Sequence, residues 1–178
     1  EVAQFEAEHP GKIILDQADY DTLLGVVTAL ANHHRARLYL DSPGPIEVAI
    51  VWDDPVTGIR LKGRLDKLAR QDRRIADLKT SFDPSEFSTH IARRGYHRQG
   101  AMYVDGLQVL TDEEYQFCLV AAETKPPFGV RAAPLSSEAI EAGRIQYRGL
   151  LEKIAECLTS QEWPGYDDPY EFTLPAQG

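Results

Sequence analysis

The spacing of apolar residues changes along the chain and predicts both helices and strands. Apolar side chains recur every three or four residues after Asp16, which predicts an amphipathic helix that Asp16 caps and that ends near Leu40. From Glu47 to Trp52 the period becomes two, which predicts a strand that leads into a hairpin loop at Asp53–Gly58. We therefore expect a helix followed by a β-hairpin.

The remaining apolar periods predict a mixed central β-sheet flanked by helices. The expected elements follow in this order: strands at 59–68 and 74–80, helices at 83–94 and 96–110, antiparallel strands at 115–122 and 129–133, and a last helix capped by Ser136 or Ser137. Segment 163–178 is rich in Pro, Tyr and Asp and is expected to form an irregular tail. Residues 1–15 look like the end of an element that starts earlier. We therefore expect one α/β domain over residues 1–178 that lacks an upstream segment.

Composition narrows the class of protein. Hydrophobic residues make up 43% and charged residues 26% of the 178 residues, which is typical of a folded domain. The chain has no apolar run of about eighteen residues, so we expect no transmembrane helix. Cys118 and Cys157 are too few for a disulfide framework or a zinc site, so we expect a cytoplasmic protein.

Charge is distributed unevenly along the chain. The sequence has 19 Lys and Arg against 28 Asp and Glu, and the net charge of −9 by itself argues against nucleic acid as a partner. Between Arg60 and Arg98, however, eleven basic residues stand against five acidic ones, so this window carries +6 and the rest of the chain −15. Such a window predicts either a surface that binds a polyanion or a solvated strand face with balancing ion pairs.

The sharpest feature is a pair of aspartates on neighbouring strands. With a tight turn at Gln71–Asp72, the hairpin of the second and third strands places Asp66 directly opposite Asp77. Like charges in facing positions destabilise a sheet, so the pair predicts a cation between the two carboxylates. Asp77 and Lys79 are two residues apart and are therefore expected on the same strand face.

Two carboxylates and one ammonium around a single point favour hydrolysis of a phosphodiester. Carboxylate oxygens suit Mg²⁺, with Mn²⁺ as the other candidate. Such a metal lowers the pKa of bound water, while Lys79 would polarise that water or hold the phosphate. Glu47 would add a third carboxylate if the first strand aligns its face with this point. The alternative is that Asp66 and Asp77 are exposed charges in weak ion pairs with Arg64 and Lys79.

Several motifs together resemble the PD-(D/E)XK nuclease superfamily, most closely the nuclease domain of exonuclease VIII and related phage exonucleases. The likeness covers roughly residues 16–163 and is carried by Gly63-Arg64-Leu65-Asp66, Ile75-Ala76-Asp77-Leu78-Lys79-Thr80, Gln99-Gly100-Ala101-Met102-Tyr103, segment 51–58, Tyr103-Val104-Asp105-Gly106 and Glu162-Trp163-Pro164. The resemblance implies a restriction-endonuclease-like core and a Mg²⁺-dependent exonuclease that degrades linear double-stranded DNA, typically from 5′ to 3′. It also implies a role in phage or prophage recombination, a single-strand annealing protein as partner and a ring-shaped homo-oligomer.

The resemblance assigns roles to individual residues of the two strands. Asp66 and Asp77 match the metal-binding acids of the superfamily, and the carbonyl of Leu78 matches an additional ligand. Lys79 matches the catalytic lysine. Glu47 matches the upstream acid of the family less closely.

The helix expected at 96–110 carries a further family motif. Gln99 and Tyr103 match the Gln-x-x-x-Tyr helix of the RecB-like branch, and at i and i+4 they share one helix face, where they would contact phosphate or position the nucleophile. The alternative for Tyr103 is an ordinary core position. Such nucleases also have a metal-binding His on an upstream helix, whereas His33 and His34 are expected at a helix end, which we interpret as a sign of the missing segment.

Polar side chains around the expected centre are candidates for DNA contacts. Arg93, Arg94 and Arg98 follow the two strands, and Arg64 and Thr80 lie within them. Two other functions stay open. One is a catalytically impaired nuclease fold that binds DNA ends or acts as a scaffold, and the other is an endonuclease of the same superfamily.

Overall fold

A five-stranded mixed sheet forms the centre of the molecule. The structure is a computed structural model that describes residue 5, residues 9–81 and residues 87–165. The strands lie in sequence order, and β3 runs parallel to β4 while the other three pairs are antiparallel. Their bounds are β1 Ile46–Asp53, β2 Arg60–Ala69, β3 Arg74–Ser81, β4 Gln116–Glu123 and β5 Val130–Pro134. The mixed sheet expected from the sequence is therefore confirmed.

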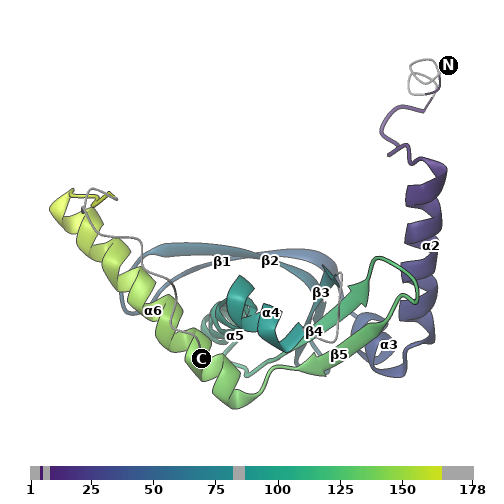
Figure 1. Ribbon diagram of the computed structural model, residues 1–178. Helices are drawn as coiled ribbons and strands as arrows, with labels where there is room; N and C mark the ends of the chain where they lie inside the picture. The colour runs from purple at the N-terminus through teal and green to yellow at the C-terminus, as the bar shows by residue number, and fades with distance from the viewer. Residues whose placement is uncertain (1–4, 6–8, 82–86, 166–178) are drawn as a thin grey trace, which may run out of the picture.

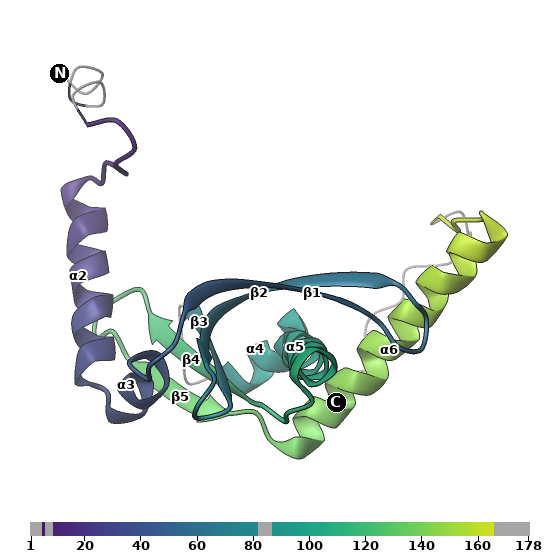
Figure 2. The ribbon, with the colours of Figure 1, turned by 180° about the vertical axis from the view of Figure 1, so that it is seen from behind.

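Helices cover both faces of this sheet. Their bounds are α2 Gln17–Asn32, α3 His34–Leu40, α4 Phe87–Arg94, α5 Tyr96–Thr111 and α6 Ser137–Ser160. α4 and α5 connect β3 to β4 and lie against one face, as Figure 1 shows, whereas α3 packs on the other face, seen in Figure 2. Parallel neighbours require a long crossover of this kind. The predicted helix start at 83–86 lies outside the described residues.

Alternation along the strands divides the apolar core into two layers. On β4, Phe117 and Leu119 pack in the layer of α4 and α5, whereas Cys118 and Val120 pack in the layer of α3. β3 alternates in the same way, and Asp77 is on the α5 side, where it meets a side chain of that helix. The sheet therefore turns the predicted site toward α5.

The single helix predicted to end near Leu40 is in fact two helices. The backbone of His33 is extended, with φ −94° and ψ 110°, and its Nδ1 accepts a hydrogen bond from the N–H of Ala36 at 3.1 Å, which caps α3. The break turns Ala36 and Tyr39 into the layer behind the sheet, where both are buried. The prediction was wrong because no Pro or Gly marks the break.

The apolar stripes of α2 and α6 are less buried than their periods suggest. None of the described residues of α2 is buried, and Leu23, Leu24 and Val27 are about half exposed. α6 buries Tyr147 and Leu151 against α5, whereas Ile145, Leu150, Ile154 and Leu158 are exposed. Among the described helices, none is long and apolar enough to cross a membrane.

A buried ion pair fastens α6 to the loop between β1 and β2. Asp54 is 2% exposed and pairs with Arg148 of α6. Thr57 donates two hydrogen bonds to Oδ2 of Asp54, from its N–H at 2.8 Å and its hydroxyl at 2.7 Å. Burial alone would raise the pKa of Asp54, but these hydrogen bonds and the charge of Arg148 hold it below its ordinary value. The buried carboxylate is therefore charged and well partnered.

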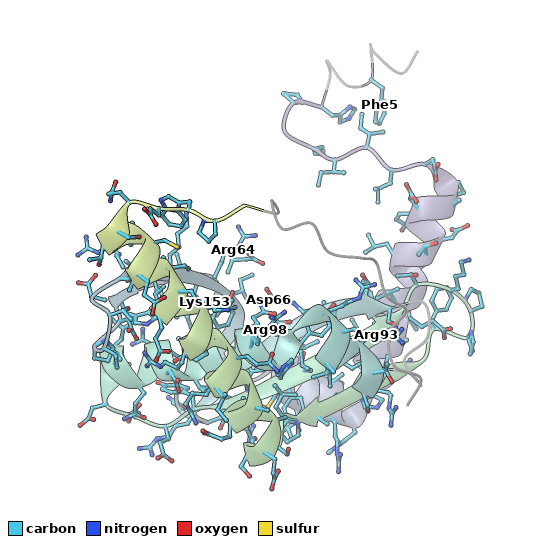
Figure 3. The ribbon with its side chains drawn as sticks, turned by 60° about the vertical axis from the view of Figure 1, so that its left-hand side comes forward. Phe5, Arg64, Asp66, Arg93, Arg98 and Lys153 are labelled. Atoms are coloured by element: carbon cyan, nitrogen blue, oxygen red, sulfur yellow. The ribbon has the colours of Figure 1, made fainter. Side chains whose placement is uncertain are left out.

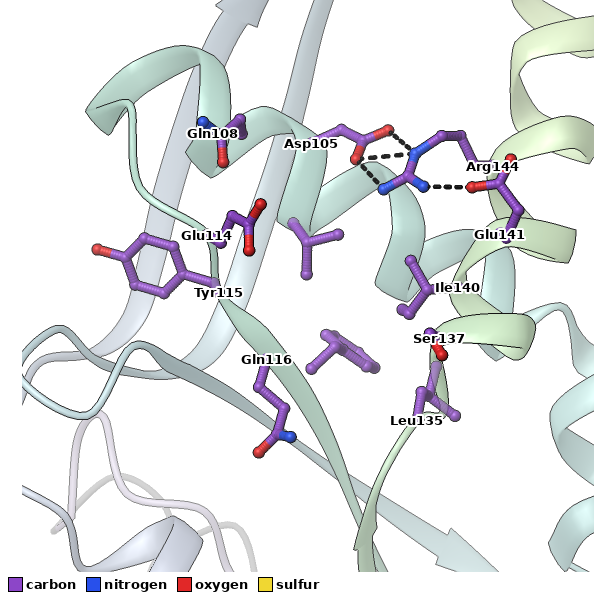
Figure 4. A pocket seen from close by; sticks show the side chains of 12 residues that line it. Asp105, Gln108, Glu114, Tyr115, Gln116, Leu135, Ser137, Ile140, Glu141 and Arg144 are labelled. Carbon is purple, nitrogen blue, oxygen red and sulfur yellow. Dashed lines mark hydrogen bonds and ion pairs between the residues drawn. The ribbon is translucent and has the colours of Figure 1, made fainter.

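A second polar cluster ties α6 to α5 beside a pocket of about 670 Å³, shown in Figure 4. Arg144 of α6 forms ion pairs with Asp105 of α5 at 2.8 Å and with Glu141 at 2.5 Å. The hydroxyl of Tyr147 donates to Asp105 at 2.5 Å. The pocket is lined by α5, the start of β4 and the start of α6, and it contains none of the predicted site residues. The cluster therefore fixes the position of α5 from the side away from the sheet.

We predict that Arg148→Ala lowers the free energy of unfolding by about 2 kcal/mol, because it leaves the buried Asp54 carboxylate without its cation. Urea unfolding followed by circular dichroism measures the change. The matched control is Arg37→Ala, which breaks a pair with Asp41 whose side chains are 62% and 61% exposed, and should cost less than about 0.5 kcal/mol. Equal decreases in the free energy of unfolding would show that the buried Asp54–Arg148 pair stabilises the protein no more than an exposed pair does.

Candidate active site

The ladder between β2 and β3 stops where the predicted site begins. The paired residues are Lys67 with Ala76, Leu68 with Ile75 and Ala69 with Arg74. This is the register that the turn at Gln71–Asp72 predicts, so the register is confirmed. The ladder nevertheless ends one step before Asp66 and Asp77, so no ladder pair joins these two residues and their direct facing stays a prediction.

Asp66 replaces the missing ladder bond with its side chain. Its Oδ2 accepts a hydrogen bond from the N–H of Leu78 at 2.8 Å. The N–H and C=O of one strand residue point the same way, so the Leu78 carbonyl also faces the open end of the ladder. The Asp66 carboxylate and the Leu78 carbonyl are thus directed to the same side of β3, and their roles as metal ligands stay predictions.

The Asp77 side chain is buried between β3 and helix α5. It is 1% exposed, and its Oδ1 accepts a hydrogen bond from Nε2 of Gln99 at 2.9 Å. Its Oδ2 forms a buried ion pair with Nζ of Lys79 at 2.5 Å. Asp77 and Lys79 therefore share a strand face, as the spacing predicts.

Burial dominates the electrostatics of Asp77. It raises the pKa of the carboxyl group above its ordinary value, and the nearby Asp66 carboxylate acts in the same direction. The Lys79 ammonium and the Gln99 amide oppose this rise but do not cancel it. The metal-free protein consequently holds Asp77 in a place that disfavours its negative charge, and an added cation would relieve that cost.

Gln99 and Tyr103 lie on one face of α5, as their spacing predicts. While Gln99 binds Asp77, the ring of Tyr103 packs against Gly63 of β2, where an added Cβ would lie 2.5 Å from the ring carbon Cε1. Tyr103 also meets Phe117 edge to face, with ring centroids 6.2 Å apart. In this structure Tyr103 is a packing residue that holds α5 against β2, and a contact of Tyr103 with phosphate stays a prediction.

The structure adds Tyr96 to the site, which the sequence reasoning missed. Nζ of Lys79 lies 5.0 Å from the centroid of the Tyr96 ring. Positions 96, 99 and 103 fall on one stripe of α5, so the same helical spacing that identified Gln99 and Tyr103 could have identified Tyr96.

The donor set fits a hard divalent cation. Asp66 supplies a partly buried carboxylate and Asp77 a buried carboxylate whose Oδ2 is paired with Lys79, and strand geometry directs the Leu78 carbonyl to the side of β3 on which its N–H binds Asp66. Groups of three or more His, Cys, Asp or Glu side chains that could hold a metal are absent from the described residues. Mg²⁺ does not need one, because it keeps several waters and commonly uses one or two carboxylates.

Glu47 is not brought to Asp77. Its backbone has φ 53°, in the left-handed region, and the β1–β2 pairing skips it between the pairs of Ile46 and Val48. Its carboxylate instead forms an exposed ion pair with Nε of Arg64 at 2.8 Å. Both the proposed metal contact of Glu47 and the DNA contact of Arg64 stay predictions, and this ion pair would have to open for either.

The other predicted DNA-contacting residues lie around the centre rather than in it. Figure 3 shows Arg64, Asp66 and Arg98 between α6 and α2, with Arg93 farther along α4. Arg93 and Arg94 are exposed in the last turn of α4, and the guanidinium of Arg98 folds over Gly95. Alternation along β3 places Thr80 on the opposite face from Asp77. A phosphate contact therefore suits Arg93 and Arg94 better than Thr80.

The upstream histidines make local contacts in the structure. Nδ1 of His33 caps α3 as described, and Nδ1 of His9 lies 2.9 Å from the carbonyl oxygen of Phe5. None of the described contacts of His33 or His9 involves Asp66 or Asp77.

Comparison with known proteins identifies the family and agrees with the fold. The profile of a PDDEXK-like domain of unknown function, DUF3799, matches residues 2–172. The crystal structure of a "Putative exonuclease" from Eubacterium rectale superposes with a TM-score of 0.69 at 16% sequence identity, covering 99% of this chain and 71% of that one. The crystal structure of SSO0001 superposes with a TM-score of 0.39 at 17% identity, covering 89% and 70% of the two chains. No curated protein matches significantly.

We predict that Asp77→Asn stabilises the metal-free protein while it destroys the centre. A raised carboxyl pKa means that the folded state binds a proton more tightly than the unfolded state, so stability falls as pH rises from about 4 toward the raised pKa. The amide side chain of the Asp77→Asn variant does not ionise, so this loss of stability at higher pH is removed. We expect the free energy of unfolding at pH 7 to increase by about 1 kcal/mol.

Urea unfolding in EDTA at pH 4 and pH 7 measures this difference. The control Asp72→Asn changes an exposed carboxylate in the β2–β3 turn and should leave the stability almost unchanged at both pH values. A lower stability of Asp77→Asn at pH 7 would contradict the electrostatic account.

Proposed function

Because the chain belongs to the PDDEXK-like family defined by the DUF3799 profile, we propose that it is a divalent-metal-dependent exodeoxyribonuclease that hydrolyses linear double-stranded DNA. The observation that supports this proposal is the Asp77–Lys79 ion pair beside Asp66, which binds the Leu78 N–H at the end of the β2–β3 ladder. Two carboxylates and one ammonium are the groups that a phosphodiester hydrolase needs to bind a cation and to hold a phosphate.

Asp66, Asp77 and the Leu78 carbonyl would hold the cation, which we propose to be Mg²⁺ or Mn²⁺. When bound, such a cation lowers the pKa of a coordinated water and offsets the charge of the phosphate. Gln99 binds Oδ1 of Asp77, while Oδ2 is paired with Lys79. Lys79 would donate a hydrogen bond to a phosphate oxygen or to the attacking water.

The finer description of the substrate rests on resemblance and on the printed description of a structural neighbour. Attack at the ends of linear duplex DNA fits the exonuclease description of the Eubacterium rectale structure. Digestion from 5′ to 3′, a role in prophage recombination with a single-strand annealing protein, and a homo-oligomeric ring follow the likeness to exonuclease VIII. We retain these points as parts of the proposal.

Charge distribution supports DNA as the substrate. The window between Arg60 and Arg98 that carries +6 contains β2, β3 and α4, while the rest of the chain carries −15. The exposed Arg93 and Arg94 lie at the end of the helix that leads into α5. An acidic molecule with a basic centre would attract DNA to the site and repel it elsewhere.

We predict that Asp66→Asn, Asp77→Asn and Lys79→Met each lower the rate of linear duplex digestion in Mg²⁺ about a thousandfold, because each removes a group from the centre. The measurement is release of acid-soluble nucleotides from an end-labelled duplex. The control is again Asp72→Asn, which should digest DNA like the unmodified protein.

Two further measurements separate this proposal from the alternatives. Equal digestion of a closed circular plasmid and its linearised form would favour an endonuclease over an exonuclease. Absence of Mn²⁺ binding at millimolar concentration, measured by calorimetry, would favour a non-catalytic scaffold. If all four variants digest linear DNA equally, the assigned centre is wrong.

We predict that Arg93→Ala and Arg94→Ala each weaken duplex binding and reduce the slope of log Kd against log salt by about 1, since each would remove one phosphate contact. Fluorescence anisotropy in the inactive Asp77→Asn background measures the slope. Arg37→Ala removes an equally exposed arginine on the opposite sheet face and should leave the slope unchanged. An equal change in all three variants would indicate general electrostatics rather than contacts at α4.

A further inference from the structure

We infer that Tyr96 is a positioning residue that holds the Lys79 ammonium at the centre through the face of its aromatic ring. Nζ of Lys79 lies 5.0 Å from the ring centroid, within the range of a cation–π contact. The Lys79 side chain is 20% exposed, so water competes only weakly for the ammonium. The role of Lys79 in cleavage rests on the proposed function, whereas the contact itself does not.

The ring is held in place independently of Lys79. Tyr96 is the first residue of α5 and follows Gly95, whose φ of +71° favours glycine. The ring packs against Phe87 of α4, with centroids 5.9 Å apart, and Phe87 is buried in the core. The start of α5, the turn at Gly95 and the contact with Phe87 together direct the ring face toward Lys79. The position of the ring therefore does not depend on Lys79.

The Lys79 ammonium needs the Tyr96 ring as a second partner because a bound metal ion would compete with it for its first partner, the Asp77 carboxylate. Oδ2 of Asp77, a candidate metal-binding oxygen, is the atom that Lys79 contacts at 2.5 Å. A cation at Asp77 would therefore take the carboxylate away from Lys79 and would also repel its charge. Without another attraction, the flexible lysine side chain would turn toward solvent when the metal arrives.

An aromatic face suits this task better than a second carboxylate would. The ring attracts the ammonium through its quadrupole and requires no single directed hydrogen bond, so the N–H groups of Lys79 that point away from the ring stay available for oxygen acceptors. The ring also carries no charge and adds no further negative group next to Asp66 and Asp77. Three residues of one α5 stripe thus have different contacts: Tyr96 holds Lys79, Gln99 holds Asp77, and Tyr103 packs on β2.

The test compares three replacements at position 96 in the full chain. Tyr96→Phe keeps the ring and its quadrupole and should keep kcat within about twofold of the unmodified protein. Replacement of Tyr96 by pentafluorophenylalanine keeps the shape but reverses the quadrupole, and Tyr96→Leu removes the ring. Both should lower kcat for linear duplex about tenfold with KM nearly unchanged, because the ammonium is lost from the centre rather than DNA from the protein.

A spectroscopic measurement tests the contact without DNA cleavage. In nuclear magnetic resonance spectra, the ring current of Tyr96 should shift the Lys79 ε-methylene protons upfield, with the signal assigned by its loss in Lys79→Met. The shift should persist in Tyr96→Phe, disappear in Tyr96→Leu, and survive addition of Ca²⁺ as a metal probe. Thermal unfolding of the Phe and pentafluorophenylalanine variants should agree within about 2 °C, which would exclude a purely structural cause.

Several outcomes would overturn the inference. Equal kcat for the Phe and pentafluorophenylalanine variants would show that the quadrupole is irrelevant, and a tenfold loss in Tyr96→Phe would assign the effect to the hydroxyl. Absence of the upfield shift, or its loss on adding Ca²⁺, would show that the ring does not hold the ammonium. If the unmodified protein digests no DNA but the shift behaves as expected, the proposed function fails while the contact stands.

Discussion

The open end of the β2–β3 ladder is the constraint on which the rest of the site depends. Two strands that stayed paired would bury the backbone groups of Leu78 in hydrogen bonds and would place two carboxylates face to face. Because pairing stops after Lys67 and Ala76, Asp66 binds the Leu78 N–H instead, and the carbonyl of the same residue becomes available. The sheet thus gives up one ladder step and gains a gap lined by oxygen atoms. The cost is a buried Asp77 carboxylate that its surroundings disfavour.

Helix α5 supports this gap from one side and is itself held from the other. Its sheet-facing stripe carries Gln99 and Tyr103, while Ala101 and Asp105 contact α6. The polar contacts of α6 reach the β1–β2 loop through Arg148, so the hairpin, both helices and the site form one connected body. This arrangement explains why a long helix that buries few of its residues is still well anchored. The ion pairs of Arg144 and Arg148 attach α6 where few apolar side chains are buried.

Short-range patterns in the sequence predicted the features of the structure that depend on neighbouring residues. Period-two alternation gave the strands, the turn at Gln71–Asp72 gave the register, and the two-residue spacing gave the shared face of Asp77 and Lys79. The end of the ladder was not predictable, because the alternation of apolar residues continues past the point at which the pairing stops. The Asp54–Arg148 pair joins residues 94 positions apart, which no single-sequence period reveals. Exposure of α2 likewise depends on what lies nearby in space, whereas its amphipathic period is a local property.

The hydrogen bond from Leu78 to Asp66 makes the Leu78 amide a natural reporter. Most amides of a sheet exchange their protons with solvent only when strands separate, so their protection reflects the whole fold. The Leu78 proton is held by a side chain at the edge of the ladder, and its exchange rate therefore reports where the Asp66 carboxylate is directed. Any ligand that draws Asp66 away would expose this one amide while its neighbours in β3, still paired to β4, stay protected. Occupancy of the centre can thus be followed at a single backbone position.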